Sequence, residues 1–274
     1  MVGRLRGRST GTASSGAGVA RTITIRGMTT ENTASNPGGS VRTSSITVDS
    51  LNAHLARPED DGGAGMLLLP MITGIDEQVR GFANDVAAAG MTALAWDPWH
   101  GPSADDTSRE RLFELLGQLD DEAVLAEQSR LLDHMFTELG LRKVGVIGWC
   151  LGGRFAFLLA GRDQRVANAV AYHPTVPIPP AANHDLDAAE YAGRISAPAM
   201  MLYPGQDSIV PRDSFDALQE ALNGRESGES IVHLYPAAEH GFADPERRKK
   251  QVNADAYDLS WPQAVAFMQV TTRS

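Results

Sequence analysis

The fold of this chain is decided by the stretch Lys143-Val144-Gly145-Val146-Ile147-Gly148-Trp149-Cys150-Leu151-Gly152-Gly153, which holds the only cysteine among 274 residues. Its apolar first half predicts a buried strand, its glycines predict a tight turn, and residues 154–160 have the composition of a helix. Strand, glycine turn and helix in this order are typical of a nucleophile elbow, whose apex side chain projects from the top of a parallel sheet. Cys150 occupies the apex, where serine is usual. A small buried hydrophobic residue is the alternative interpretation.

Two downstream segments offer an acid and a base for this thiol. Residues 198–203 predict a short buried strand, and Asp207 follows in a Gly/Pro-rich loop; residues 230–235 predict the next strand, and His240 comes shortly after it. Parallel sheets build their sites at the carboxyl edge, where both residues would lie. Nucleophile, acid and histidine in this order are typical of α/β-hydrolases. Taken singly, the Asp would be a turn residue and the His a surface or core group.

Three motifs give the chain its resemblance to the dienelactone hydrolase family, over about residues 41–270. They are G-x-C-x-G-G at Cys150, G-x-D-x-x-V-P at Asp207 and Tyr-Pro-x-x-x-His-Gly-Phe at His240. The resemblance implies an α/β-hydrolase fold, with a mostly parallel central sheet flanked by helices on both faces. It also implies hydrolysis of esters or lactones by a Cys-His-Asp triad, with no metal or organic cofactor.

The chain departs from the family pattern around the expected substrate. Met71 stands where family members often carry a glutamate that contacts the resting thiol. Arginines that hold a substrate carboxylate in the family would align near Gly101 and at Asp244. Because an aspartate repels a carboxylate, we expect neutral esters to be better substrates than anionic dienelactones.

Two backbone amides are candidates for the oxyanion hole. A nucleophile elbow supplies one N–H from the residue after the nucleophile, which is Leu151 here. The second is expected in the loop after the strand at residues 66–69, and by resemblance it belongs to Ile72. The Ile72 side chain is equally compatible with a place in the core.

Further residues near the same edge are candidates for a substrate pocket: Met71, Trp99, His100, Tyr172 and His173. His173 is a candidate hydrogen-bond donor, although both histidines are also compatible with ordinary loop positions. No histidine pair has metal-ligand spacing with a third ligand, so we expect no metal.

Composition is compatible with an enzyme acting on a small molecule. The chain is 42% hydrophobic, carries a formal charge of −10 and has no run of 18 apolar residues. The acidic charge disfavours nucleic acid and anionic membranes as partners. One cysteine excludes an intramolecular disulfide and fits a reducing compartment. We therefore expect a cytoplasmic monomer or small homo-oligomer whose partner is a small-molecule ester or lactone.

The N-terminus has a different composition. Residues 1–27 hold five arginines and no Asp or Glu, among Gly, Ser, Thr and Ala. We predict a disordered extension over residues 1–40, followed by a single α/β-hydrolase domain over residues 41–274. Alternatives are an upstream start, with Met28 as the true first residue, or a segment faintly similar to a transit peptide.

The remaining elements are predicted from periodicity and turn residues. They are an antiparallel edge hairpin at 41–48 and 53–57, a strand at 66–69, a helix at 76–89, a strand at 91–96, a helical stretch at 108–139 broken near Gly117 or Asp120, a strand at 165–172, helices at 184–194 and 212–222, and a terminal helix at 253–270 kinked or interrupted at Pro262.

The sequence thus predicts a cysteine-dependent hydrolase that passes through a thioacyl-enzyme. Met71 keeps a second hypothesis open. A degenerate α/β-hydrolase would instead bind a small ligand without turnover, or sense redox state through its thiol.

Overall fold

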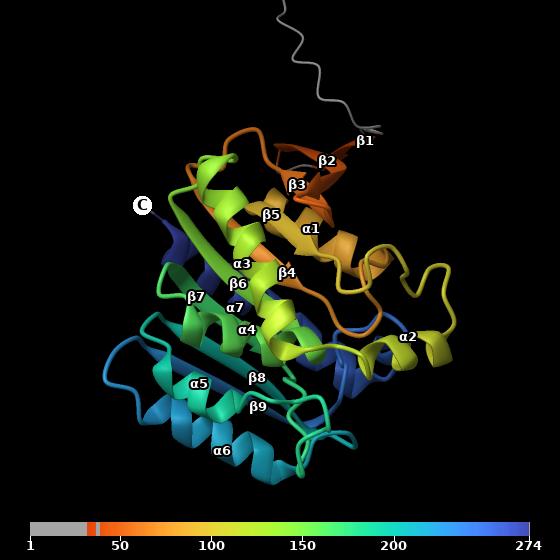
Figure 1. Ribbon diagram of the computed structural model, residues 1–274, viewed down its shortest axis with the longest axis vertical. Helices are drawn as coiled ribbons and strands as arrows, with labels where there is room; N and C mark the ends of the chain where they lie inside the picture. Colours follow the sequence, from red (N-terminus) through yellow and green to blue (C-terminus); the bar gives the residue numbers. More distant parts are fainter. Residues whose placement is uncertain (1–31, 37–38, 274) are drawn as a thin grey trace, which may run out of the picture.

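The computed structural model describes residues 32–36 and 39–273 and contains a nine-stranded mixed sheet between two layers of helices (Figure 1). The strand order is β1-β2-β3-β5-β4-β6-β7-β8-β9. The strands are β1 (Asn32–Asn36), β2 (Gly39–Val48), β3 (Leu51–Arg57), β4 (Ala64–Leu69), β5 (Thr92–Trp96), β6 (Lys143–Trp149), β7 (Val166–Tyr172), β8 (Ala199–Gln206) and β9 (Ser230–Glu239). β4 to β9 are mutually parallel, whereas β1, β2 and β3 pair antiparallel at one side.

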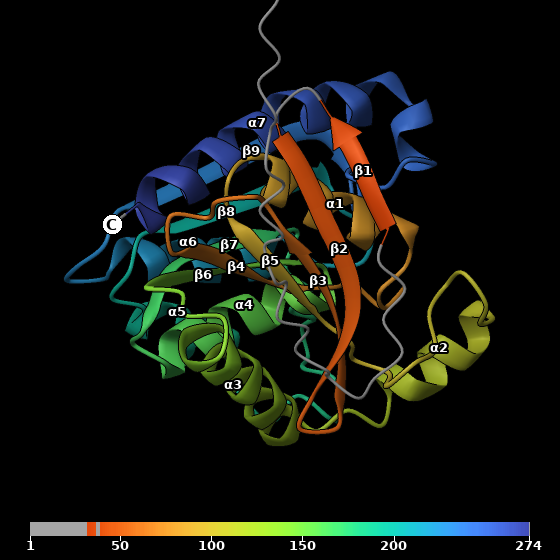
Figure 2. The same ribbon diagram turned by 90° about the horizontal axis from the view of Figure 1, so that it is seen from above.

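Helices cover both faces of the sheet, as the sequence predicts for an α/β-hydrolase (Figure 2). They are α1 (Glu77–Ala88), α2 (Arg109–Leu116), α3 (Asp121–Thr137), α4 (Leu151–Arg162), α5 (Ala188–Arg194), α6 (Arg212–Asn223), the 3₁₀ turn η1 (Arg247–Lys249) and α7 (Gln251–Thr272). One face packs against α1 and α7, and the other against α3 to α6. This arrangement confirms the predicted fold class.

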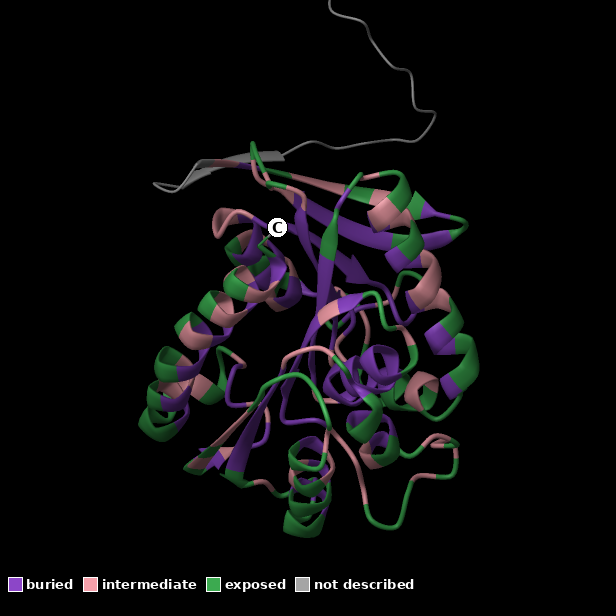
Figure 3. Cartoon of the chain, turned by 90° about the vertical axis from the view of Figure 1, so that its left-hand side faces the viewer, coloured by how far each residue is buried: buried purple, intermediate pink, exposed green. Residues whose placement is uncertain are grey.

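Each face of the sheet carries its own apolar core. Along β4 the side chains alternate between the two cores, so that Leu67 joins one and Leu68 the other, and both are fully buried. A strand covered on both faces reads as a continuous apolar run, which is the pattern of residues 66–69. On the α1/α7 face Phe82 stacks on Trp149 with ring centroids 4.4 Å apart. The buried strands and the inward sides of the helices are visible in Figure 3.

Helix boundaries follow their capping residues. The side chains of Asp76, Ser108, Asp120 and Asp187 accept backbone N–H bonds at the starts of α1, α2, α3 and α5. The predicted break between Gly117 and Asp120 is confirmed. The helix predicted from residue 184 begins only at Ala188, because Asp187 caps it.

Another predicted boundary changes in the structure. α7 is not interrupted at Pro262, because the buried residues Trp261, Ala264 and Met268 on either side hold it against the sheet. Strand β1 lies within the extension predicted over residues 1–40, and the division into that extension and a domain over residues 41–274 stays a prediction. β1 covers backbone groups that β2 would otherwise leave unpaired at the sheet edge. Residues 1–31, 37, 38 and 274 lie outside the described residues.

Candidate active site

The carboxyl ends of neighbouring parallel strands bring the candidate residues together. Because β4, β6, β7, β8 and β9 are adjacent in that order, residues far apart in sequence meet at one edge. The residues that follow these strands are Met71 and Ile72 after β4, Cys150 after β6, His173 and Thr175 after β7, Asp207 after β8, and His240 after β9.

The elbow at Cys150 requires glycine on both sides. Cys150 has φ 54° and ψ −113°, a strained conformation for a residue other than glycine. A Cβ on Gly152 would lie 1.9 Å from the Leu69 carbonyl oxygen, and a Cβ on Gly148 would lie 2.0 Å from the Gly152 carbonyl oxygen. Only glycine therefore allows the strand and α4 to approach this closely.

Asp207 and His240 form a buried pair. The carboxylate Oδ2 lies 2.7 Å from Nδ1 of His240, and the two side chains are 2% and 6% exposed. The amides of Ile209 and Val210 donate to the other oxygen, Oδ1, at 2.8 and 2.9 Å. Burial alone would lower the pKa of His240, but hydrogen bonding to Asp207, with a further contribution from Cys150, raises it to about 9.

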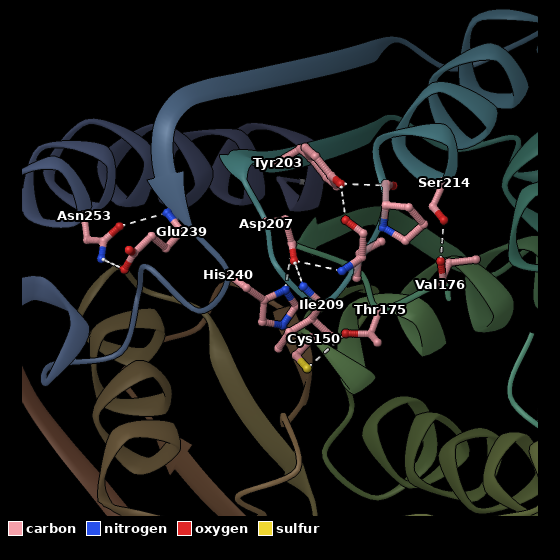
Figure 4. Close-up of polar contacts among 12 residues, drawn as sticks. Cys150, Thr175, Val176, Tyr203, Asp207, Ile209, Ser214, Glu239, His240 and Asn253 are labelled. Carbon is pink, nitrogen blue, oxygen red and sulfur yellow. Dashed lines mark hydrogen bonds and ion pairs between the residues drawn. The ribbon is translucent and has the colours of Figure 1, made fainter. Parts of the chain in front are cut away.

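The Cys150 thiol lies on the other side of this imidazole (Figure 4). Its Sγ is 3.0 Å from the Thr175 hydroxyl, and the Thr175 amide donates to the Cys150 carbonyl at 3.0 Å. Burial opposes ionisation of the thiol. Hydrogen bonding and charge from His240, followed by the Thr175 hydroxyl and the Leu151 amide, nevertheless lower the pKa of Cys150 below its ordinary value.

The contact between Thr175 and Cys150 is not predicted by the sequence. Thr175 lies 25 residues beyond Cys150, and no motif marks it. The nearest signal is its position three residues after the end of β7, next to the predicted pocket residue His173. Nε2 of His240 has no well-aligned hydrogen bond within the described residues. Among these residues, Sγ of Cys150 is therefore hydrogen-bonded to the Thr175 hydroxyl and not to His240.

The two candidate oxyanion amides belong to loops that are held in place. Leu151 is the first residue of α4, and the next amide, that of Gly152, donates to the Pro70 carbonyl at 3.0 Å. The indole Nε1 of Trp99 donates to the Ile72 carbonyl at 2.8 Å. These bonds tie the loop after β4 to the elbow and to the chain beyond β5.

A cavity of about 760 Å³ opens over Cys150 and His240. Of the predicted pocket residues, Met71 and His173 line it, and Ile72 and Leu151 also contribute. Most of the wall is apolar. Side chains from α2 form part of it, namely Leu112, Phe113 and Leu116.

Three predicted pocket residues lie elsewhere. Trp99 is buried, and its indole is hydrogen-bonded to the Ile72 carbonyl in the loop after β4. His100 is half exposed, and its Nε2 lies 3.2 Å from the carboxylate of Glu127. Their strand, β5, is separated from β6 by β4, which displaces them from the thiol. Tyr172 is fully buried among the aromatic residues of the α1/α7 face, because strand alternation points it away from the cavity.

The structure also adds charged residues to the cavity. Arg109 of α2 and Arg247 of η1 line it, together with Asp244. Because arginine binds carboxylates, Asp244 alone does not disfavour an anionic substrate in this cavity, and the preference for neutral esters stays a prediction. Arg154 is not a cavity residue. It forms a buried bidentate pair with Asp121 at 2.6 and 2.7 Å.

Within residues 32–36 and 39–273, no group of three or more His, Cys, Asp or Glu side chains is arranged to hold a metal ion. No helix in this part of the chain has the length and apolar character that crossing a membrane requires.

Comparison with known proteins gives consistent matches. The model of the dienelactone hydrolase family matches residues 51–272. Carboxymethylenebutenolidase 2 of Cupriavidus pinatubonensis is 31% identical over 184 residues, covering 66% of this chain and 74% of the relative. Carboxymethylenebutenolidase of Rhodococcus opacus is 27% identical over 212 residues, covering 76% and 82%. A solved dienelactone hydrolase-like promiscuous phosphotriesterase from metagenomic libraries has a TM-score of 0.64 at 20% identity, covering 89% of this chain and 99% of that one.

Proposed function

Because this chain belongs to the dienelactone hydrolase family and is an ester or lactone hydrolase, we propose that it acts through a Cys150-His240-Asp207 triad and a thioacyl-enzyme. The substrate is a small-molecule ester or lactone bound in the cavity over Cys150. The names of the curated relatives support this substrate class, since a carboxymethylenebutenolidase acts on a lactone.

The reaction starts from a thiolate–imidazolium pair. Asp207 holds the proton on Nδ1 of His240, which leaves Nε2 to take the thiol proton. A thiolate can only accept hydrogen bonds, so the Thr175 hydroxyl then donates to Sγ. This resting state is supported by the raised pKa of His240 and the lowered pKa of Cys150.

Acylation follows from attack of the thiolate on the substrate carbonyl. The S–C bond forms, and the carbonyl oxygen becomes an oxyanion that the Leu151 and Ile72 amides stabilise. His240 gives its proton to the leaving alcohol as the ester C–O bond breaks. A thioester on Cys150 remains, and water activated by His240 hydrolyses it.

One observation carries the proposal. The hydrogen-bonded pair of Asp207 and His240 adjoins the strained, glycine-flanked Cys150 at the base of a largely apolar cavity. A merely structural cysteine would need neither the strained backbone nor a buried imidazole–carboxylate pair beside it.

The test is a substrate panel with matched variants. Wild type, Cys150→Ala and Cys150→Ser are compared on p-nitrophenyl esters, thioesters and unsaturated lactones. We expect wild-type turnover, a loss of at least about 10³-fold in Cys150→Ala, and acyl-protein in the quenched wild type but not in that variant. Equal turnover by wild type and Cys150→Ala would refute the nucleophile. Tight binding of a panel compound without turnover by any form would favour the ligand-binding alternative.

A further inference from the structure

His173 adopts a backbone conformation that few residues other than glycine adopt. It directly follows β7 and has φ +36°, in the left-handed region. Its amide donates to the Leu202 carbonyl at 2.8 Å, which ties it to the middle of β8. Strained backbone of this kind persists where the surrounding structure holds it, and it occurs preferentially at functional sites.

The ring of His173 is fixed beside the catalytic histidine. Its centroid lies 4.7 Å from that of His240, with the two rings inclined at 57°. Phe242 meets it in a T-shaped contact at 5.8 Å. The residue is 1% exposed, yet it lines the cavity that contains Cys150.

The two ring nitrogens of His173 form no hydrogen bond with another described residue. Apart from an approach to its own backbone carbonyl, neither ring nitrogen of His173 has a hydrogen-bond partner within the described residues. Burial, and then the positive charges of His240 and Arg247, hold the pKa of His173 well below its ordinary value. A neutral imidazole has one donor nitrogen and one acceptor nitrogen. The neutral ring of His173 therefore offers an acceptor nitrogen that no other described residue uses.

We propose that His173 holds the water that hydrolyses the thioester on Cys150. This inference rests on the proposed function. The attacking water directs one hydrogen to Nε2 of His240, which acts as the base. Its second hydrogen needs an acceptor, and the neutral ring of His173 supplies one next to His240. With both hydrogens engaged, a lone pair of the water oxygen is directed at the thioester carbonyl.

The bonds and protons balance in this step. The water oxygen bonds to the thioester carbon, and one water proton moves to Nε2 of His240. The C–S bond then breaks, the carboxylic acid leaves, and Sγ departs as the thiolate. The thiolate–imidazolium pair is thereby restored. His173 keeps the same protonation throughout, so its role is to bind and orient the water.

The distinguishing experiment separates acylation from deacylation. His173→Phe keeps a flat ring against His240 and Phe242 but removes both nitrogens, whereas His173→Gln keeps an acceptor. With a p-nitrophenyl ester, we expect His173→Phe to release the first equivalent of nitrophenol within about threefold of the wild-type rate. Its later turnover falls about tenfold or more, the size expected for a lost hydrogen bond to a reacting molecule. Acyl-protein should then accumulate in intact-mass spectra, and His173→Gln should accumulate less of it.

Equal slowing of the first turnover and the later ones, or no excess acyl-protein in His173→Phe, would overturn the role of His173. If His173→Phe fails to fold by thermal melting, His173→Met replaces it, with the same expectation. A wild type that forms no acyl-protein on Cys150 under rapid quenching would refute the proposed function itself. The two failures are therefore distinguishable.

Discussion

The two sides of the cavity are built differently. The edge that holds the proposed triad, which we call the catalytic edge, comprises Cys150, Thr175, Asp207 and His240 at the ends of four adjacent parallel strands. It contains two hydrogen-bonded pairs, Cys150 with Thr175 and His240 with Asp207. The α2 rim, defined by Arg109, Leu112, Phe113 and Leu116, belongs to a short helix that stands away from the sheet in both views (Figures 1 and 2). Within α2 only Leu112 is buried, and Phe113 is 48% exposed.

From this difference we expect the reaction and the choice of substrate to depend on different residues. On the proposed mechanism, substitutions at the catalytic edge should affect every ester, because they change groups that act on the carbonyl itself. Substitutions at the α2 rim should affect only substrates long enough to reach it.

The largest effect is expected from Asp207→Asn. The amide cannot hold the proton on Nδ1 of His240 as the carboxylate does, so the imidazole loses the tautomer that the reaction needs. We expect kcat to fall about 10³-fold on short and long esters alike, with unchanged folding by circular dichroism. Asp213→Asn, in the first turn of α6, is the control. A loss of kcat confined to long esters would contradict the different roles of the catalytic edge and the α2 rim.

The next effect concerns the stability of the elbow. Gly152→Ala would place a Cβ 1.9 Å from a backbone oxygen that cannot move aside freely, so we expect a loss of about 3 kcal/mol or more in the free energy of unfolding. Gly81→Ala in α1 is the matched control, because a Cβ there meets nothing within 4 Å. It should be stabilising by about 0.5 to 1 kcal/mol. Urea unfolding measures both, and equal effects would contradict the account.

A smaller effect is expected at Thr175. Thr175→Val keeps the shape but removes the hydroxyl that donates to the thiolate, so the pKa of Cys150 should rise. We expect kcat/KM at pH 7 to fall about tenfold, the value of one hydrogen bond to a charged group. Thr175→Ser should restore most of it. A lower thiol pKa in Thr175→Val would mean that the thiol donates to Thr175 instead.

The smallest effect is expected at the α2 rim. Phe113→Ala removes a half-exposed aromatic ring from the cavity wall, at a cost of about 1 kcal/mol for a substrate that packs on it. The value of kcat/KM should fall about fivefold for an octanoate ester and remain unchanged for an acetate ester. Val270→Ala, an exposed change on α7, is the control. A similar loss on acetate would show that α2 also supports the catalytic edge.

The same contrast explains what the sequence could predict. Cys150, Asp207 and His240 each follow a strand with glycine or proline nearby, so local patterns locate them and the parallel topology brings them together. The fold class and the break between α2 and α3 also depend on local signals, namely periodicity and capping.

The residues that the sequence did not predict depend on tertiary placement. Arg109 and Arg247 reach the cavity only because α2 and η1 are positioned over it, and no short motif encodes that position. Trp99 follows β5 and Tyr172 ends β7, much as the proposed catalytic residues follow their strands. The intervening strand β4 and the alternation of side chains along β7 direct them elsewhere.

The most direct test of the central claim is the pH dependence of Cys150 alkylation. The protein has one cysteine, so intact mass after iodoacetamide treatment reports this site alone. Because the pKa of Cys150 is lowered and that of His240 is raised to about 9, the thiolate–imidazolium pair should already react at pH 7. His240→Ala removes the imidazolium, so its alkylation should shift to higher pH. Wild-type labelling that begins only above about pH 8.5, and that His240→Ala leaves unchanged, would contradict the activated nucleophile.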